Sequence, residues 1–192
     1  MLITVEGLDG AGKTTLVAGL AEHLDATVLR EPGGVELSER IRTLVQDPSL
    51  HVDPRAEALL YAAARAQLVA ERLEPLLEAD TTVILDRFVD SSLAYQGGGR
   101  RLGVDEIRAL NAFGTAGLVP DRTLLLRVAP EVGLARIAGR EADRLERAGG
   151  EFFARVAMTY DELAAAEPHR FVVLDAALPP DTVLAHAIEA LT

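Results

Sequence analysis

The sequence contains no cysteine, and only one of its 19 lysine and arginine residues is a lysine, Lys13. Without cysteine the chain can form neither disulfides nor thiolate metal sites, which fits a reducing cytoplasm. No apolar run approaches the length of a membrane span, and the first residues lack the basic stretch of a secretion signal. The formal net charge of −11 disfavours a surface that binds nucleic acid or anionic lipid. We therefore expect no nucleic acid or membrane partner, and any anionic ligand must be held by local groups of cations.

The remaining composition is that of a globular protein. With 192 residues, of which 49% are hydrophobic, the chain is long enough for one sizeable core, and nothing in its length requires a second domain. We expect a single soluble domain over residues 1–192, located in the cytoplasm. Two glycine clusters, at 97–99 and at 149–150, are predicted to be the places where the chain can move.

Short β-rich runs alternate with longer helical patterns along the chain. The predicted strands are 2–6, 26–30, 81–86, 122–128 and 170–174. Alanine, leucine, glutamate and arginine recur at helical spacing over 14–24, 37–45, 54–77, 104–113, 131–140, 150–166 and 180–191. This alternation predicts an α/β fold in which crossover helices join parallel strands and cover both faces of the sheet.

The stretch GLDGAGKT, from Gly7 to Thr14, matches the phosphate-loop pattern G-x-x-x-x-G-K-[ST] between an apolar strand and a helical pattern. Glycines let backbone N–H groups converge on phosphate oxygens, and the helix N-terminus adds a favourable dipole. Lys13 is expected to reach the β- and γ-phosphates of a nucleotide, and Thr14 to bind Mg²⁺. A compact ammonium suits a narrow loop where a broad guanidinium would not replace it equivalently. The predicted nucleotide-binding residues of the loop are Gly7, Leu8, Asp9, Gly10, Ala11, Gly12, Lys13, Thr14 and Thr15. The alternative is a glycine-rich turn with an incidental lysine.

The strand predicted over 81–86 ends in the sequence VILDRF. Asp86 is expected to hold Mg²⁺ partly through water, as a Walker B aspartate does. The next residue is Arg87, where many ATP-hydrolysing motors carry a glutamate that activates water. Its planar fork suits a second phosphate, and the alternative is an ordinary surface ion pair. Because the only lysine is in the phosphate loop, the chain has no Asn-Lys-x-Asp guanine motif, so a GTPase is disfavoured.

Five segments occur in a fixed order across nearly the whole chain: EGLDGAGKTT, REPGG, LLYAAARAQ, LDRFVDSSLAYQGGGR and FFARVAMTYDELA. In these segments the chain resembles bacterial thymidylate kinases. The resemblance implies the fold of P-loop nucleoside monophosphate kinases, a three-layer sandwich with a five-stranded parallel sheet and a mobile lid at about 136–150. It also implies a homodimer that uses ATP and Mg²⁺ to phosphorylate dTMP to dTDP, feeding dTTP synthesis.

The same resemblance implies roles in the acceptor site. Asp9 matches an acid that contacts the 3′-hydroxyl of the acceptor sugar, and Tyr95 matches an aromatic residue that crowds its 2′ position. Tyr61 replaces the phenylalanine that usually stacks on thymine. Arg65, one helical turn later, matches an arginine on the thymine edge or the acceptor phosphate. The other implied acceptor residues are Arg30, Pro32, Arg87, Ser92, Gln96 and Arg100. For Arg30, Pro32 and Arg100 a purely structural role is the alternative.

The lid is the source of the remaining implied residues. Positions 8–11 of the phosphate loop contain no arginine, unlike the loops of some family members. The resemblance then implies a catalytic arginine in the lid, where READRLE is similar to a bacterial subgroup with a local length difference. Arg140 and Arg144 are the candidates to neutralise charge together with Lys13 and Arg87, and Arg136 is the candidate to pack on adenine. The alternative for this run is a solvated face of mixed charge.

The chemistry requires no strong general base. The second pKa of a phosphate monoester is roughly 6, so the acceptor is already ionised near neutral pH. Two alternatives remain. One is another nucleoside monophosphate kinase, although the Gly-Lys-Gly-Thr loop typical of adenylate kinases is absent. The other is a regulatory subunit that binds ATP without turnover, which an ADP-release assay distinguishes from an enzyme.

Overall fold

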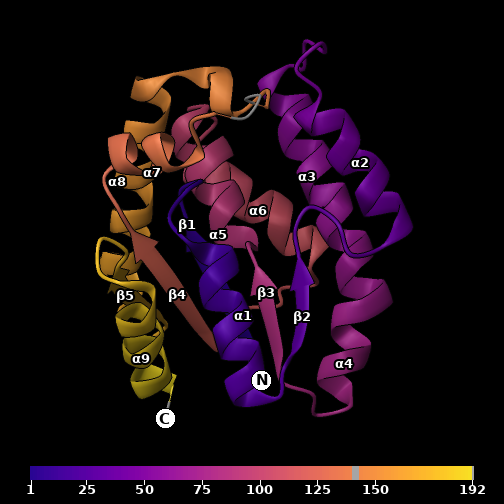
Figure 1. The fold of residues 1–192 in the computed structure, drawn as a ribbon. Helices are drawn as coiled ribbons and strands as arrows, with labels where there is room; N and C mark the ends of the chain where they lie inside the picture. Colours follow the sequence, from indigo (N-terminus) through magenta and orange to yellow (C-terminus); the bar gives the residue numbers. More distant parts are fainter. Residues whose placement is uncertain (140–142, 192) are drawn as a thin grey trace.

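The computed structural model describes residues 1–139 and 143–191. Within these ranges one sheet contains β1 (Leu2–Gly7), β2 (Thr27–Arg30), β3 (Val83–Asp86), β4 (Arg122–Arg127) and β5 (Phe171–Asp175). The strand order is β2-β3-β1-β4-β5, and every neighbouring pair is parallel. This confirms the predicted α/β fold with a five-stranded parallel sheet. The carboxyl ends of the strands meet at the upper edge of the sheet in Figure 1, where ligands of parallel α/β proteins bind.

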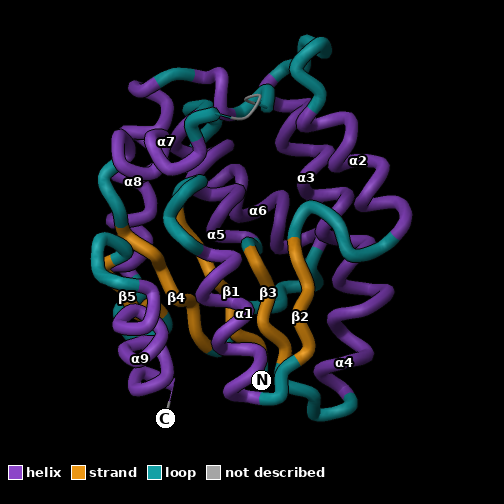
Figure 2. Tube along the Cα trace, viewed as in Figure 1, coloured by secondary structure: helices purple, strands orange, loops and turns teal. Residues whose placement is uncertain are grey.

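Helices cover both faces of the sheet (Figure 2). On one face lie α1 (Lys13–Leu24) and α9 (Pro180–Leu191). The helices of the other face are α3 (Pro54–Leu68), α5 (Val89–Ser92), α6 (Val104–Gly114) and α8 (Gly150–Ala166). The described chain also contains α2 (Glu36–Gln46), which packs on α3, as well as α4 (Glu74–Glu78) and α7 (Pro130–Ile137). Two π-helical segments, Val69–Leu73 and Leu93–Gly99, and a 3₁₀ turn at Glu146–Ala148 complete the described elements.

The core follows from the side-chain alternation of the strands. Ile3 of β1 packs with Leu20 of α1 and Val183 of α9. Leu125 of β4 points to the opposite face and packs with Phe153 of α8. Since successive side chains of a strand point to opposite faces, the central strands β1 and β3 contribute buried side chains to the core on both sides of the sheet.

The segment 89–99 differs most from the sequence prediction, which placed no helix there. It folds into α5 and the π-helical Leu93–Gly99, and its glycines are packed against α8 and α6. A Cβ atom added to Gly98 would lie 1.9 Å from Oγ1 of Thr159. The expectation of a movable glycine cluster at 97–99 was therefore wrong, because these glycines serve a close helix approach.

Candidate active site

The phosphate loop leaves the carboxyl end of β1 and enters α1 at Lys13. Gly12 precedes the helix with φ 99°, a left-handed conformation that favours glycine. Gly10 also has positive φ, and a Cβ there would lie 2.1 Å from the carbonyl oxygen of Gly133 in α7. The first turn of α1 contains no acidic side chain. The loop therefore presents the N–H groups of a helix N-terminus to an anion without a competing carboxylate in that turn.

Lys13 folds back over this loop and is 8% exposed. Its Nζ donates to the carbonyl oxygens of Gly7 (3.2 Å) and Leu8 (2.9 Å) and lies 3.8 Å from Oδ1 of Asp9. Burial, together with the charge of Arg87, lowers the pKa of Lys13 to about 8. A bound phosphate would favour the charged ammonium and raise this pKa again.

Asp86 ends β3, directly beside β1 in the sheet. Its Oδ1 is buried and has no hydrogen-bond partner. Thr14, in the first turn of α1, is exposed. In the described parts of the chain, no group of three His, Asp or Glu residues could hold a metal ion. The side-chain oxygens of Asp86 and Thr14 fit Mg²⁺, which kinases bind through one or two protein oxygens, water and the phosphates of the substrate.

Arg87 follows Asp86 with φ 69°, which is uncommon for a residue with a side chain. Its Nη1 donates to the carbonyl oxygen of Gly7 (3.1 Å) and to Oγ of Ser91 (3.0 Å), and its Nη2 donates to Oδ1 of Asp9 (2.6 Å). Although burial opposes ionisation, the charges of Arg87 and Lys13 lower the pKa of Asp9 to about 2. A guanidinium is thus fixed beside the phosphate loop by an ionised carboxylate.

A pocket adjoins Arg87 and brings together most of the predicted acceptor residues. These are Asp9, Pro32, Tyr61, Arg65, Arg87, Ser92, Tyr95 and Gln96. The residues of the wall that sequence reasoning missed are Glu31, Gln46, Ser91, Asp143 and Leu145. The predicted roles of the eight residues are untested, but their common location is a property of the fold.

Arg65 is only 2% exposed, and protein groups bind its guanidinium. Nε donates to Oε2 of Glu31 (2.7 Å), Nη2 to the carbonyl oxygen of Phe88 (2.9 Å), and Nη1 to Ser92 (3.0 Å) and Asn111. Burial raises the pKa of Glu31 to about 7 despite this ion pair. In this structure Arg65 holds other pocket residues in place, and its predicted contact with thymine or phosphate remains a prediction.

Two residues predicted for the acceptor site lie outside the pocket wall. Arg30 forms an exposed ion pair with Glu39, 2.7 Å apart. Arg100 donates to Glu57 (3.0 Å), and its guanidinium lies over the ring of Phe152. These partners match the structural alternative for both arginines.

The predicted lid arginines occupy different places. Arg136 donates to the carbonyl oxygens of Gly10 (3.3 Å) and Ala176 (3.0 Å) at a cavity of about 310 Å³ next to the phosphate loop. Arg144 instead pairs with Glu57 at 2.7 Å. Arg140 lies outside the described residues. Arg136 therefore lies beside the phosphate loop, whereas Arg144 is bound to α3.

Glu6 is a buried acid that sequence reasoning did not assign to the site. It accepts hydrogen bonds from the backbone N–H of Phe88 (2.8 Å), from Oγ of Ser91 (2.6 Å) and from the hydroxyl of Tyr160 (2.9 Å). Burial raises the pKa of Glu6. Because Ser91 also accepts from Arg87, this network supports the position of that guanidinium. An acid within the apolar run LITVEG was the available signal.

A cavity of about 650 Å³, larger than the acceptor pocket, lies elsewhere, between β4, β5 and α8. Gly7 and Leu8 of the phosphate loop border this cavity, and so does Tyr160, which donates to Glu6. None of the eight predicted acceptor residues lines it. Its wall includes Leu126, Val128 and the half-exposed Val173. Size therefore does not identify the site, whereas the convergence of charged side chains at the carboxyl edge of the sheet does.

The strand order, the glycine loop around Lys13 and the aspartate at the end of β3 define the class of P-loop nucleotide-binding proteins. A family model described as Thymidylate kinase matches residues 5–187. The chain is 48% identical to "Thymidylate kinase" of Deinococcus radiodurans over 198 residues, covering 100% of this chain and 96% of the relative. It is 47% identical to "Thymidylate kinase" of Bifidobacterium longum strain DJO10A over 199 residues, covering 99% and 96%.

A solved structure gives the same answer. The crystal structure of thymidylate kinase from Ehrlichia chaffeensis matches with a TM-score of 0.82 and 31% identity, covering 100% of this chain and 98% of that one. The chain belongs to the thymidylate kinase family, whose reaction is the phosphorylation of dTMP to dTDP. This confirms the family resemblance, the fold and the class of enzyme predicted from the sequence.

Proposed function

We propose that this enzyme phosphorylates dTMP to dTDP, with ATP as donor, at the point where Lys13 and Arg87 meet. One atom carries the proposal: Oδ1 of Asp9 lies 2.6 Å from Nη2 of Arg87 and 3.8 Å from Nζ of Lys13. The cation of the phosphate loop and the cation of the acceptor pocket thus share a carboxylate. A phosphoryl group transferred between two phosphates needs cations on both, and this geometry supplies them.

On the donor side, the loop N–H groups from Gly7 to Thr15 and the ammonium of Lys13 bind the phosphates of ATP. Thr14 and Asp86 would hold Mg²⁺, Asp86 partly through water; the ion, when bound, neutralises charge on the β- and γ-phosphates. The buried, unpartnered Oδ1 of Asp86 supports this assignment. Arg136, beside the same loop, packs on adenine.

On the acceptor side, Arg87 binds the 5′-phosphate of dTMP. Asp9 accepts a hydrogen bond from the 3′-hydroxyl, and Tyr95 lies against the 2′ position of the sugar. The hydroxyl of Tyr95 donates to Asp9 (3.3 Å) and accepts from Arg87 (3.4 Å), and this proximity supports assigning Asp9 and Tyr95 to the same sugar. Tyr61 stacks on thymine, while Ser92 and Gln96 read its edge. The buried Arg65 holds Glu31 and Ser92 of this pocket in position through its hydrogen bonds.

The lid, at about 136–150 of a single domain, brings further positive charge to the reaction. Arg140 is the candidate for the transferred phosphoryl group. Arg144 would have to leave Glu57 to join it, which makes Arg140 the stronger candidate. No helix in the described part of the chain is long and apolar enough to cross a membrane, and a cytoplasmic location stays a prediction.

We also propose a homodimer, with Leu59 and Phe113 in its interface. These side chains are 58% and 91% exposed on α3 and α6, two helices that pack on each other. Gly114 closely approaches the carbonyl oxygen of Ala62, one turn after Leu59. Large apolar side chains exposed on two helices that pack on each other favour a protein partner.

The proposal is tested by ADP release with ATP, Mg²⁺ and a panel of dTMP, dUMP, UMP, CMP, AMP and GMP. We expect strong selectivity for dTMP in the wild type, and loss of turnover with an unchanged circular dichroism spectrum in Lys13→Ala. Preference for another monophosphate would overturn the residues assigned to the base. Absence of ADP release with every monophosphate of the panel would favour a subunit that binds ATP without turnover.

A further inference from the structure

Glu57 of α3 is a fully buried carboxylate surrounded by three donor residues, two from segment 96–100 and one from the lid. Its Oε1 accepts from Nε2 of Gln96 (2.9 Å) and from Nε of Arg100 (3.2 Å). Its Oε2 accepts from Nη2 of Arg100 (3.0 Å) and lies 2.7 Å from Nη1 of Arg144. Glu57 thereby connects a residue assigned to base reading with Arg144 of the lid.

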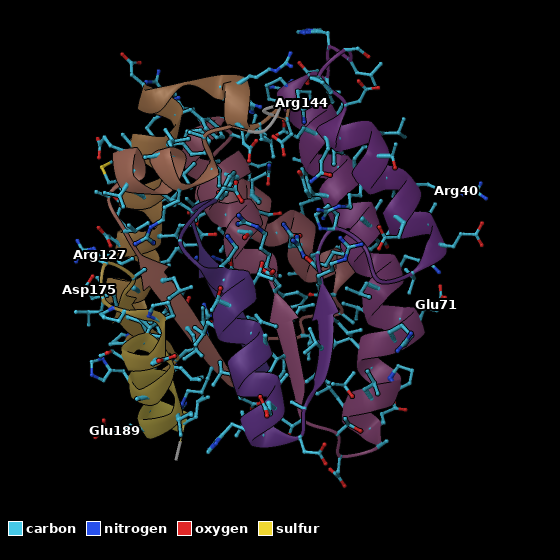
Figure 3. All side chains as sticks on the ribbon, viewed as in Figure 1. Arg40, Glu71, Arg127, Arg144, Asp175 and Glu189 are labelled. Atoms are coloured by element: carbon cyan, nitrogen blue, oxygen red, sulfur yellow. The ribbon has the colours of Figure 1, made fainter. Side chains whose placement is uncertain are left out.

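Arg144 is tied to α2 as well as to α3. Its Nε donates to the carbonyl oxygen of Val45 (2.9 Å), and its backbone N–H donates to that of Gln46 (3.3 Å). The side chain is 11% exposed. Figure 3 shows Arg144 at the upper edge, where this part of the lid meets the ends of α2 and α3. Both the backbone and the guanidinium of this residue thus bind the acceptor side of the molecule.

The residues on either side of Arg144 belong to the pocket wall. Asp143 and Leu145 line the acceptor pocket together with Gln46 and Tyr61. The carboxylate of Asp143 accepts from the backbone N–H of Leu145 (2.9 Å), which makes this turn compact. The contacts that hold Arg144 in place therefore also hold one wall of the pocket.

We infer that Glu57 and Arg144 are positioning residues that hold segment 143–148 as a wall of the acceptor pocket. The inference rests on the proposed function, since it takes this pocket as the dTMP site. It assigns Arg144 to acceptor binding and not to the transferred phosphoryl group, because Nε and Nη1 are both engaged on α2 and α3. Losing Arg144 removes the contact of its Nη1 with Glu57 and the hydrogen bond of its Nε to Val45, so the segment should detach from α2 and α3.

The cleanest variant is Arg144→Leu, because Arg100 still neutralises Glu57 and Gln96 keeps its contact. We expect the KM for dTMP to rise about tenfold, equivalent to ~1.4 kcal/mol of binding, with kcat within about threefold and the KM for ATP within about twofold. Hydrogen exchange of segment 143–148 should become faster. The matched control is Arg127→Leu, which removes an exposed ion pair with Asp161 on the far side of the molecule in Figure 3 and should change neither readout.

A second variant separates positioning from simple stability. Arg144→Lys keeps a positive charge near Glu57 but has no Nε to donate to Val45, and we expect a smaller rise in the KM for dTMP. In a double-mutant cycle, the effects of Arg144→Leu and Glu57→Gln on this KM should be less than additive, because both remove the same contact.

Three results would overturn the inference. A fall in kcat of about 100-fold with an unchanged KM for dTMP would place Arg144 on the transferred group. Unchanged kinetics and unchanged exchange in Arg144→Leu would remove any positioning role. Unchanged exchange in both Arg144 variants, combined with a lower melting temperature, would leave only a structural role. Failure of the proposed function is distinguishable, since the wild type would then release no ADP with dTMP while hydrogen exchange could still be measured.

Discussion

Single side chains set the charge balance of the site. Asp9 stays ionised at neutral pH because Arg87 and Lys13 lower its pKa to about 2. Lys13 experiences the opposite balance, since burial and Arg87 lower its pKa to about 8 despite the nearby carboxylates. The loop of the free enzyme is thus closer to losing a positive charge than an exposed lysine would be, and nucleotide binding must restore it.

The lowered pKa of Lys13 in the free enzyme predicts that ATP binding takes up a proton. Above pH 8 the free enzyme has a largely neutral Lys13, whereas phosphate oxygens favour the ammonium, so binding at pH 9 should take up about one proton. ATP affinity should then fall as pH rises above 8, by up to about tenfold per unit. Calorimetry in two buffers of different ionisation enthalpy measures the uptake, and Lys13→Met is the control that should abolish it. Equal apparent enthalpies in both buffers would contradict the predicted pKa change.

Tyr95 should set the preference for deoxyribose through its ring. The ring is 4% exposed and packs edge-on against Phe152 and Tyr160, with centroids 6.0 and 6.4 Å away. Tyr95→Phe keeps the ring and should keep the ratio of kcat/KM for dTMP over UMP, whereas Tyr95→Leu should narrow it by about tenfold. Initial rates with both acceptors give this ratio. An unchanged ratio in Tyr95→Leu would take the role away from the ring.

The residues predicted from sequence are those that a local motif contains. Lys13 follows a glycine pattern, and Asp86 with Arg87 ends an apolar strand, so each has a signal within a few positions. Glu57 has no such signal, because its partner Arg144 is 87 positions away. Its burial and its donors exist only after the chain has folded, which is why sequence reasoning missed it.

The phosphate loop and the segment 93–99 both use glycine, but for different physical reasons. In the loop, Gly10 and Gly12 have positive φ. In the π-helical segment Leu93–Gly99, no glycine has this conformation, and the missing side chains instead let α8 approach. A glycine cluster read from sequence does not distinguish a flexible turn from a close contact, which explains the wrong prediction at 97–99.

Gly98 should therefore tolerate no side chain. A Cβ there would lie 1.9 Å from Oγ1 and 2.9 Å from Cβ of Thr159, so Gly98→Ala should lower the free energy of unfolding by about 1–3 kcal/mol. Adding Thr159→Ala removes the nearer atom and should recover part of this loss. The control is Gly150→Ala, where nothing lies within 4 Å and which should be neutral or slightly stabilising. Urea denaturation measures all four proteins, and equal stability of Gly98→Ala and wild type would contradict the close approach.

The regular helices and strands were predictable because the apolar residues of each recur with a characteristic spacing along the sequence. The strands β1 and β4 begin at the predicted residues, and α8 and α9 have the predicted bounds. The boundary errors at β2 and β3 are one or two residues, at positions where strand pairing ends. The short α5 and the π-helical turns lack a periodic pattern of their own, since tertiary packing decides them.

The whole molecule combines a strongly acidic composition with a site for two anionic substrates. Its net charge of −11 gives no general attraction for nucleotides. Cations gather locally instead: Lys13, Arg87 and Arg136 all contact the phosphate loop. The parallel sheet makes this possible, because it brings the ends of β1 and β3 to one edge from positions about 80 residues apart.

The proposed homodimer is a property that the fold alone does not determine. Phe113 is 91% exposed near the end of α6, so Phe113→Asp would place a charge in the proposed interface and should raise the dimer dissociation constant by about 100-fold or more. Phe113→Leu should stay dimeric, because an apolar side chain remains. Met158→Asp, at an apolar position on α8 that is 56% exposed, about as much as Leu59, should also leave the dimer intact. Sedimentation velocity across a concentration series distinguishes these cases: a monomeric wild type would refute the dimer, and dissociation of Met158→Asp alone would move the interface from α3 and α6 to α8.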